Sequence, residues 1–117
     1  MKTKRFVMES RVAATPREVY DWHQRPYAFE RVMPPWENTR ASVHQHVFQE
    51  GMKVGFYFDL GPIRFDWRAR YENVIDGVQF VDVQEKGPFP IWRHTHRFDD
   101  DGRGGCIVRD HVEYALP

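Results

Sequence analysis

The stretch Ile63-Arg-Phe-Asp-Trp-Arg-Ala-Arg-Tyr71 decides the fold class, because it alternates strictly between two kinds of residue. The apolar set is Ile63, Phe65, Trp67, Ala69 and Tyr71, and the polar set between them is Arg64, Asp66, Arg68 and Arg70. Side chains alternate between the two faces of a β-strand, so a period of two predicts a strand with one dry and one wet face. Such a strand is typical of an antiparallel sheet that packs its dry face against a core.

Turn signals divide much of the chain into further strands. They fall at Glu50-Gly51, Gly61-Pro62, Asp76-Gly77, Gly87-Pro88, and Asp101-Gly102 with Gly104-Gly105. The intervals between them are typical of consecutive hairpins. The strands that we expect are residues 5–14, 40–49, 53–60, 63–71, 79–86, 91–98 and 106–114.

Helical signals are confined to the segment between the first two strands. Thr15 has the character of an N-cap, Pro16 suits the first helical position, and the helix should stop before Pro26. A second short helix is expected at residues 27–32. Strands segregated from helices indicate an α+β fold, with a curved antiparallel sheet of about seven strands forming a single domain over residues 1–117. Two short helices cannot cover such a sheet, which leaves room for an apolar cavity.

Composition narrows the function classes. The 117 residues include 17 Lys and Arg and 17 Asp and Glu, so the formal net charge is zero and no basic surface for nucleic acid is indicated. The aromatic content of 15% is high for a chain whose mean hydropathy is −0.70. The single cysteine, Cys106, excludes an internal disulfide and favours a reducing compartment. With no apolar run of signal-peptide or membrane-spanning length, we expect a cytoplasmic protein without stable membrane insertion.

The segment Trp92-Arg-His-Thr-His-Arg-Phe98 is the most informative polar stretch. On a strand, Trp92, His94, His96 and Phe98 share one face, and the apolar ends of this set predict that the face points inward. Two imidazoles would then lie against the dry side of the sheet.

The neighbouring strands offer partners for these two imidazoles. The face that carries Phe80 also carries Asp82 and Gln84, and the inward face of the last strand carries Asp110. Cross-strand neighbours lie about 5 Å apart, so we expect one polar cluster. Three interpretations stay open: a buried hydrogen-bond network, a patch that orients a ligand, and a zinc or iron site.

The other histidines and the cysteine are expected to have structural or surface roles. His44 and His46 alternate with apolar residues and should face water. His23 ends the first helix, where a cation suits the helix dipole, and His111 should be exposed. Cys106 is expected to be a buried, inert thiol, since no base is positioned beside it.

Several motifs together resemble the SRPBCC group, the START-like helix-grip proteins that include polyketide cyclase/dehydrase and lipid-transport domains. The motifs are Ala14-Thr-Pro-Arg-Glu-Val-Tyr20, Arg25-Pro26, Met33-Pro-Pro-Trp-Glu37, Gly61-Pro62, Phe80-Val-Asp-Val-Gln84, Gly87-Pro-Phe89, Trp92-Arg-His-Thr-His96 and Asp110-His-Val-Glu-Tyr-Ala-Leu-Pro117. The resemblance covers nearly the whole chain. It implies a seven-stranded sheet that grips a long C-terminal helix around a hydrophobic cavity, in a family that binds lipids, polyketides, quinones or hormones and has a minority of enzymes.

The sequence departs from that family at its end. It stops at Pro117, where the family continues into the long helix, so this helix is either truncated or replaced by another chain. The uncovered face would expose a large apolar patch, which monomers rarely tolerate. We therefore expect a homodimer that covers the concave face.

Three hypotheses for function follow. The first is the binding of a hydrophobic small molecule, lipid or polyketide-like, without a metal or cofactor. The ligand-binding residues that we expect are Phe56, Phe58, Phe65, Trp67, Gln84, Trp92, His94, His96 and Tyr114. The second is a cyclase or dehydratase with a strand histidine as general base, whose catalytic candidates are His94, His96, Asp82 and Asp110. The third is an accessory interaction domain without a ligand.

Overall fold

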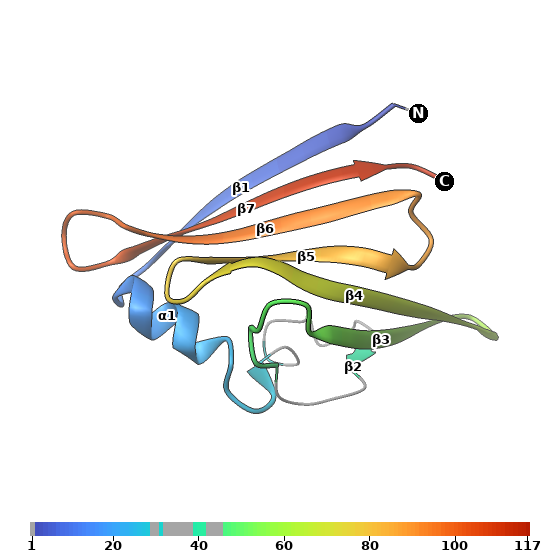
Figure 1. The fold of residues 1–117 in the computed structure, drawn as a ribbon, viewed down its shortest axis with the longest axis horizontal. Helices are drawn as coiled ribbons and strands as arrows, with labels where there is room; N and C mark the ends of the chain where they lie inside the picture. The colour runs from blue at the N-terminus through green and yellow to red at the C-terminus, as the bar shows by residue number, and fades with distance from the viewer. Residues whose placement is uncertain (1, 29–30, 32–38, 42–45) are drawn as a thin grey trace.

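Seven strands form one antiparallel sheet in the computed structural model, which describes residues 2–28, 31, 39–41 and 46–117 (Figure 1). The strands are β1 (Lys4–Val12), β2 (Thr39–Ala41), β3 (Lys53–Leu60), β4 (Ile63–Ile75), β5 (Gln79–Lys86), β6 (Ile91–Asp100) and β7 (Cys106–Ala115). Their order in the sheet is β1-β7-β6-β5-β4-β3-β2. Strands β2 to β7 thus form a meander, and β1 joins its end by pairing with β7.

The expected α+β fold with a curved sheet is confirmed, and the differences lie at element boundaries. Strands β3 and β5 have the expected bounds, whereas β4 and β6 run further than expected. In β4 the pairing with β5 shifts register twice, and Asn73 adopts a positive φ of 50°. These irregularities bend a strand while pairing continues beyond them, so the simple alternation ends before the strand does. Of the strand expected at 40–49, only residues 40 and 41 are strand, within β2. Residues 42–45 lie outside the described part, and 46–49 are irregular.

One helix, α1 (Pro16–Trp22), follows β1 and has the expected start. The Thr15 hydroxyl accepts a hydrogen bond from the Glu18 backbone N–H at 3.2 Å, and Pro16 occupies the first turn. Such a cap satisfies an N–H that has no partner inside the helix. Of the second expected helix, residues 28 and 31 are helical, and residues 29, 30 and 32 lie outside the described part.

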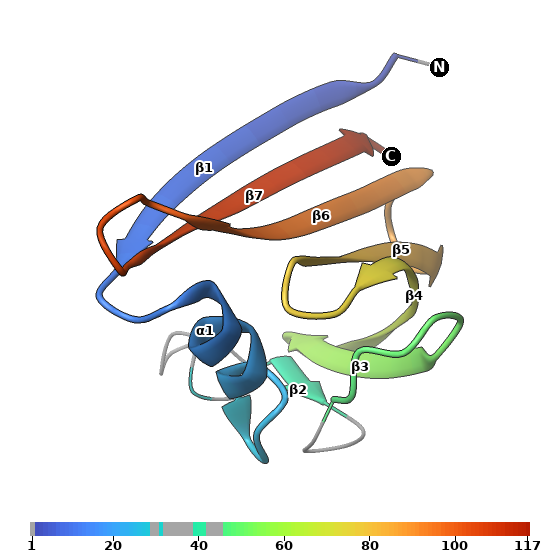
Figure 2. The ribbon, with the colours of Figure 1, turned by 60° about the vertical axis from the view of Figure 1, so that its left-hand side comes forward.

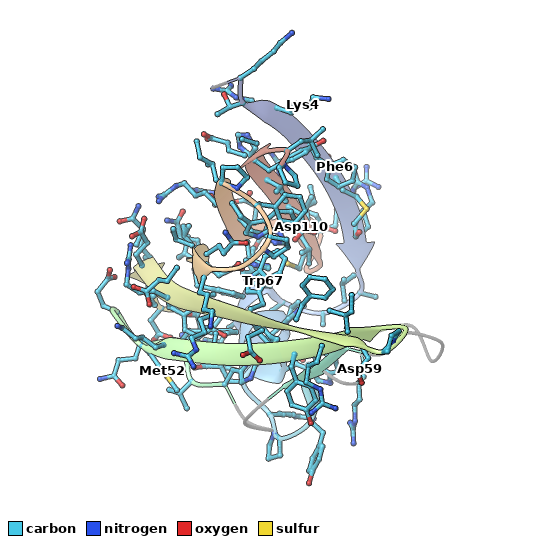
Figure 3. All side chains as sticks on the ribbon, turned by 90° about the vertical axis from the view of Figure 1, so that its right-hand side faces the viewer. Lys4, Phe6, Met52, Asp59, Trp67 and Asp110 are labelled. Atoms are coloured by element: carbon cyan, nitrogen blue, oxygen red, sulfur yellow. The ribbon has the colours of Figure 1, made fainter. Side chains whose placement is uncertain are left out.

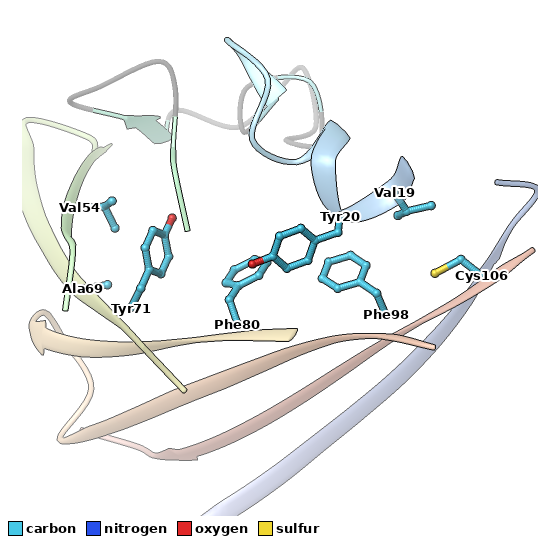
Figure 4. Packing of buried hydrophobic residues seen from close by; sticks show 8 residues of the cluster. All are labelled: Val19, Tyr20, Val54, Ala69, Tyr71, Phe80, Phe98 and Cys106. Atoms are coloured by element: carbon cyan, nitrogen blue, oxygen red, sulfur yellow. The ribbon is translucent and has the colours of Figure 1, made fainter. Parts of the chain in front are cut away.

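The core lies at one end of the concave side of the sheet, where α1 packs against it. Figure 2 shows the strands following a curve with α1 on its inner side. Tyr20 of α1 is 1% exposed, and its ring meets that of Phe98 edge-on at a centroid distance of 5.4 Å (Figure 4). The ring of Phe48 also meets Tyr20 edge-on, at the same centroid distance. Cys106 is fully buried in the same cluster, as expected. We call this part of the molecule the closed end.

A charged contact fixes α1 to the turn between β4 and β5. The Arg17 guanidinium donates to both carboxylate oxygens of Asp76, at 2.7 and 3.0 Å, and also to Asp21. It lies against Gly77, which turns the chain with a φ of 74°. The position of the helix over the sheet is therefore held by apolar packing together with the ion pair between Arg17 and Asp76.

Nothing comparable covers the concave side near β1 among the described residues. Every residue of β1 is exposed, and Phe6 and Met8, which point to the concave side, are 52% and 49% exposed. We call this part of the molecule the open end. No helix in the described part of the chain is both long and apolar enough to cross a membrane.

Candidate functional site

A cavity of about 870 Å³ occupies the concave side of the sheet, between the closed end and the open end. Side chains from β1 and from β3 to β7 line it, together with residues near α1. In Figure 3 the labelled Trp67 and Asp110 lie between β1 and the β3–β4 pair, on the inner side of the curve. Trp67 and Trp92 meet at a right angle on its wall, with ring centroids 5.1 Å apart. The lining is therefore largely aromatic, as in sites for hydrophobic molecules.

Four polar side chains meet at the bottom of this cavity, and we call them the polar floor: Asp82, His94, His96 and Asp110. The Nε2 atom of His94 lies 2.8 Å from Asp110 Oδ1, and the Nε2 atom of His96 lies 2.6 Å from Asp82 Oδ2. The two imidazoles stack with their centroids 3.6 Å apart. The expected clustering of these residues is thus present in the structure.

The hydrogen bonds of the polar floor cross the strand register. By backbone pairing, Asp82 stands opposite His94, and Asp110 stands opposite His96. Each imidazole nevertheless bonds to the carboxylate that faces its neighbour, while its Nδ1 atom points toward the carboxylate opposite to it. Those second distances are 3.9 Å for His94 to Asp82 and 3.5 Å for His96 to Asp110. The result is a closed cycle in which every imidazole lies between both carboxylates.

Burial and charge act against each other in the polar floor. Each of its side chains keeps only about a fifth of its surface exposed, on the side of the cavity. Burial lowers the pKa of His96, although its hydrogen bond to Asp82 opposes this. Burial alone would raise the pKa of Asp110, but the hydrogen bond from His94 and the nearby imidazoles hold this pKa below its usual value. The structure therefore favours ionised Asp110 and neutral His96.

Donor atoms of Asp82, His94 and His96 lie within 4.8 Å of one another, so the metal interpretation can be tested against geometry. Imidazole and carboxylate are suitable ligand types for zinc or iron. However, the Nε2 atom of His96 is already hydrogen-bonded to Asp82, and a metal would have to replace that proton. The arrangement fits a hydrogen-bonded cluster better than a metal centre.

Some of the aromatic residues predicted to bind ligand line the cavity, and others do not. Phe56, Trp67 and Trp92 line the cavity. Phe65 and Tyr114 do not, and Tyr114 lies beside Trp92 instead, at a centroid distance of 6.2 Å. The side chain of residue 58 (Phe58) lies outside the described part. The alternation of the strands predicted the face, but not how far the cavity extends along each strand.

Gln84 was predicted to orient a ligand, and the structure places it elsewhere. Its amide group is bonded to the backbone of Phe89 in the turn between β5 and β6, accepting from the Phe89 N–H at 3.3 Å and donating to the Phe89 carbonyl. Gln84 is not among the residues that line the cavity. A long amide side chain next to a turn satisfies the free backbone groups there, and the alternation gives no sign of this.

Two histidines that the sequence placed in structural or surface roles line the cavity. His46 is buried at 7% exposure and lies 3.3 Å from the Tyr71 hydroxyl through its Nδ1 atom, so the prediction that it faces water was wrong. His23 caps α1, and its Nδ1 atom lies 2.7 Å from the Val19 carbonyl oxygen. A carbonyl only accepts, so Nδ1 carries the proton and Nε2 presents a lone pair in the neutral ring. His44 lies outside the described residues.

The prediction for His111 also needs correction. It lies on the outer face of the sheet, but it is half-buried, and its Nε2 atom is shielded from solvent without a partner in the described part of the chain. Val7 of β1 and Thr95 of β6 flank it in the sheet. The sequence could not show this burial, because it depends on β1 lying next to β7.

No protein-family model matches the sequence, and neither does any curated protein. Solved structures do match. Protein Ms6760 from Mycobacterium smegmatis has a TM-score of 0.72 at 17% identity, over 98% of this chain and 78% of that one. A norcoclaurine synthase point mutant from Thalictrum, in complex with a transition-state analogue, has a TM-score of 0.73 at 14% identity, over 99% and 77%.

A third match has a different extent. A nucleoside-diphosphate sugar epimerase from Corynebacterium glutamicum is 26% identical with a TM-score of 0.71, over 92% of this chain but only 24% of the epimerase chain. The same fold is therefore one part of a longer protein there. Together these likenesses show that the chain has the helix-grip-like fold of the Bet v1-like, or SRPBCC, proteins.

Proposed function

We propose that this protein binds a hydrophobic small molecule in the cavity on the concave side of its sheet, with residues 1–117 acting as one binding domain. The observation that supports this best is the cavity of about 870 Å³ itself, which is in the range of known small-molecule sites. Aromatic walls supply apolar contact, and the polar floor supplies a few directed polar groups. Members of this fold bind hydrophobic ligands, which is consistent with the proposal.

Two neighbouring positions on β1 provide a matched test. Met8 lines the cavity opposite Asp110, and Val7 points to the other face of the same strand. Both are exposed in the structure, so a larger side chain is tolerated at either position. A Met8→Trp variant should fill space above the polar floor and weaken the binding of the neutral probe Nile red about tenfold or more. A Val7→Trp variant should bind the probe like the original protein.

Fluorescence titration measures these affinities, and native mass spectrometry of the purified protein searches for a co-purified lipophilic molecule. Binding that is equal in both variants would place the probe on the surface and contradict the proposal. The absence of both probe binding and a co-purified molecule would contradict it as well.

An enzyme of the cyclase or dehydratase type is the second candidate, and the histidine–carboxylate pairs of the polar floor favour it. A carboxylate that holds an imidazole is a common arrangement around a general base, and His94 or His96 would fill that role. Turnover of a polyketide-like substrate that is lost in His94→Ala or His96→Ala, with the fold retained, would support this candidate. An affinity loss alone would support binding. The partial match to the epimerase chain favours the remaining alternative, an accessory domain.

A further inference from the structure

The polar floor holds two carboxylates that no lysine or arginine among the described residues of the cavity lining balances. Two carboxylates, Asp82 and Asp110, face the cavity, and no lysine or arginine from the described residues lines it. The charge of the polar floor therefore depends on how many protons its two imidazoles hold.

The geometry disfavours protonation of both imidazoles at once. In a neutral imidazole the Nε2–H donates to one carboxylate, and Nδ1 directs a lone pair at the other one, 3.5 to 3.9 Å away. One added proton relieves this contact, because the imidazolium then donates to both carboxylates. A second proton would place two cations in rings whose centroids are 3.6 Å apart, which is unfavourable. With both carboxylates ionised and at most one imidazolium, the polar floor is a net anion.

The groups around the polar floor would also stabilise a cation. The π-faces of aromatic rings attract cations, and Trp is the strongest of them. Trp67 and Trp92 lie on the cavity wall, and the ring centroid of Trp92 is 6.4 Å from that of His94 in the polar floor. In its neutral form His23 adds an acceptor, since its Nδ1–H donates to the Val19 carbonyl and the Nε2 lone pair remains.

We propose that the cavity selects hydrophobic molecules that carry a cationic amine, with the ammonium group at the polar floor and the apolar body between the aromatic walls. This inference rests on the proposed function and names its ligand class. An organic ammonium needs no vacant ligand atom, because it donates to carboxylate oxygens that already accept from imidazoles. A carboxylate oxygen has two lone pairs, so one oxygen serves both donors.

Three probes of nearly equal shape test the selection for amines in the unmodified protein: 2-(2-naphthyl)ethylamine, 2-(2-naphthyl)ethanol and 2-naphthaleneacetate, the carboxylate of naphthaleneacetic acid. Isothermal titration calorimetry at neutral pH gives the three dissociation constants. A charge-assisted hydrogen bond in place of a neutral one should make the amine bind about tenfold tighter than the alcohol. The acetate should bind weakest. Equal binding of amine and alcohol, or tighter binding of the acetate, would overturn the inference.

The outcomes separate this inference from the proposed function. If the alcohol binds and the amine binds no better, the cavity is a ligand site without amine selection. If none of the three probes binds and Nile red does not bind either, the proposed function itself fails. A titration with zinc chloride in the absence of probe covers the metal alternative. A stoichiometric zinc complex that is lost in His94→Ala and that excludes the amine would reassign the polar floor and overturn the inference.

Variants of the two aspartates test whether the preference for the amine originates at the polar floor. Asp82→Asn and Asp110→Asn, singly, should reduce the ratio of amine to alcohol affinity by several-fold, because the amide keeps an acceptor oxygen for either probe but loses the charge. The matched control is Glu113→Gln, which removes a carboxylate from β7 on the opposite face of the same sheet. It should leave the ratio unchanged. Circular dichroism confirms that each variant is folded. An unchanged ratio in both folded aspartate variants would overturn the inference.

Discussion

The closed end and the open end of the concave face differ in what covers them, and under the proposed function the difference separates stability from binding. At the closed end, α1 seals the sheet, and Tyr20 is 1% exposed. At the open end, Phe6 is 52% exposed although it faces the same side of the same sheet. Burial removes apolar surface from water and stabilises the fold, whereas surface left open can be covered by a guest. Under the proposed function, one sheet thus contributes stability at one end and ligand contact at the other.

The largest expected effect comes from breaking the closed end. Tyr20→Ala removes the ring that packs against Phe48, Phe80 and Phe98. Truncating a buried aromatic side chain costs about 3–5 kcal/mol, so the free energy of unfolding should fall by that amount. Urea denaturation followed by circular dichroism measures it. A loss under about 1 kcal/mol would show that α1 does not seal the sheet as described.

The next prediction tests the ion pair between Arg17 and Asp76 that holds α1 in place. Gly77 has a φ of 74°, and a Cβ atom there would lie 2.8 Å from Arg17 Nη1. Gly77→Ala should therefore cost about 1–2 kcal/mol, from the backbone conformation and from displacing the arginine. Gly102→Ala is the control, since Gly102 has a φ of 80° and no atom lies near its Cβ position. Equal losses in the two variants would mean that the arginine adapts without cost.

A smaller effect is expected in the pH dependence of stability. It arises from the polar floor, which lies between the closed end and the open end. The pKa of His96 is lowered in the folded protein, so its contribution to stability is complete above the unfolded value near 6.5 and is lost as the pH falls. The lowered pKa of Asp110 adds a second loss at more acidic pH, below its unfolded value of about 3.8. Urea midpoints measured from pH 8 to pH 3 should decline in this order. A His96→Gln variant should lack the upper decline, and a midpoint that rises below pH 6.5 would contradict the prediction.

The smallest effect on stability is expected at the open end. Phe6→Ala removes a ring that is already half exposed to solvent, so the free energy of unfolding should change by less than about 1 kcal/mol. Because Phe6 lines the cavity, the affinity for Nile red should fall several-fold in the same variant. Tyr20→Ala, in contrast, is expected to lower the free energy of unfolding by about 3–5 kcal/mol. If Phe6→Ala destabilises the protein as much as Tyr20→Ala does, the two ends are not distinct.

The sequence predicted the faces of the strands better than it predicted contacts between elements. The alternation of Trp92, His94, His96 and Phe98 was enough to place two imidazoles on the inner face, and neighbouring strands brought the aspartates to them. The alternation could not show which carboxylate each imidazole selects, because that choice depends on how the rings stack.

Contacts outside the alternating strands were not predictable in this way. His46 is buried in an irregular segment, where no period exists to indicate a face. His23 was interpreted from the helix dipole, and that argument does not show which side of the helix end meets the cavity. The outer-face burial of His111 depends on the pairing of β1 with β7, whose strands lie at opposite ends of the sequence.

The same pairing brings both chain ends to one side of the molecule (Figure 1). Lys4 stands opposite Tyr114 in the sheet, and the next inward-facing pair, Phe6 and Val112, lines the cavity. A peptide tag or a fused protein at either end would therefore start within a few residues of the cavity wall. A fluorophore on the N-terminus should therefore respond to ligand binding in the cavity. A bulky tag should be removed before affinities are measured, because it would hinder access to the cavity.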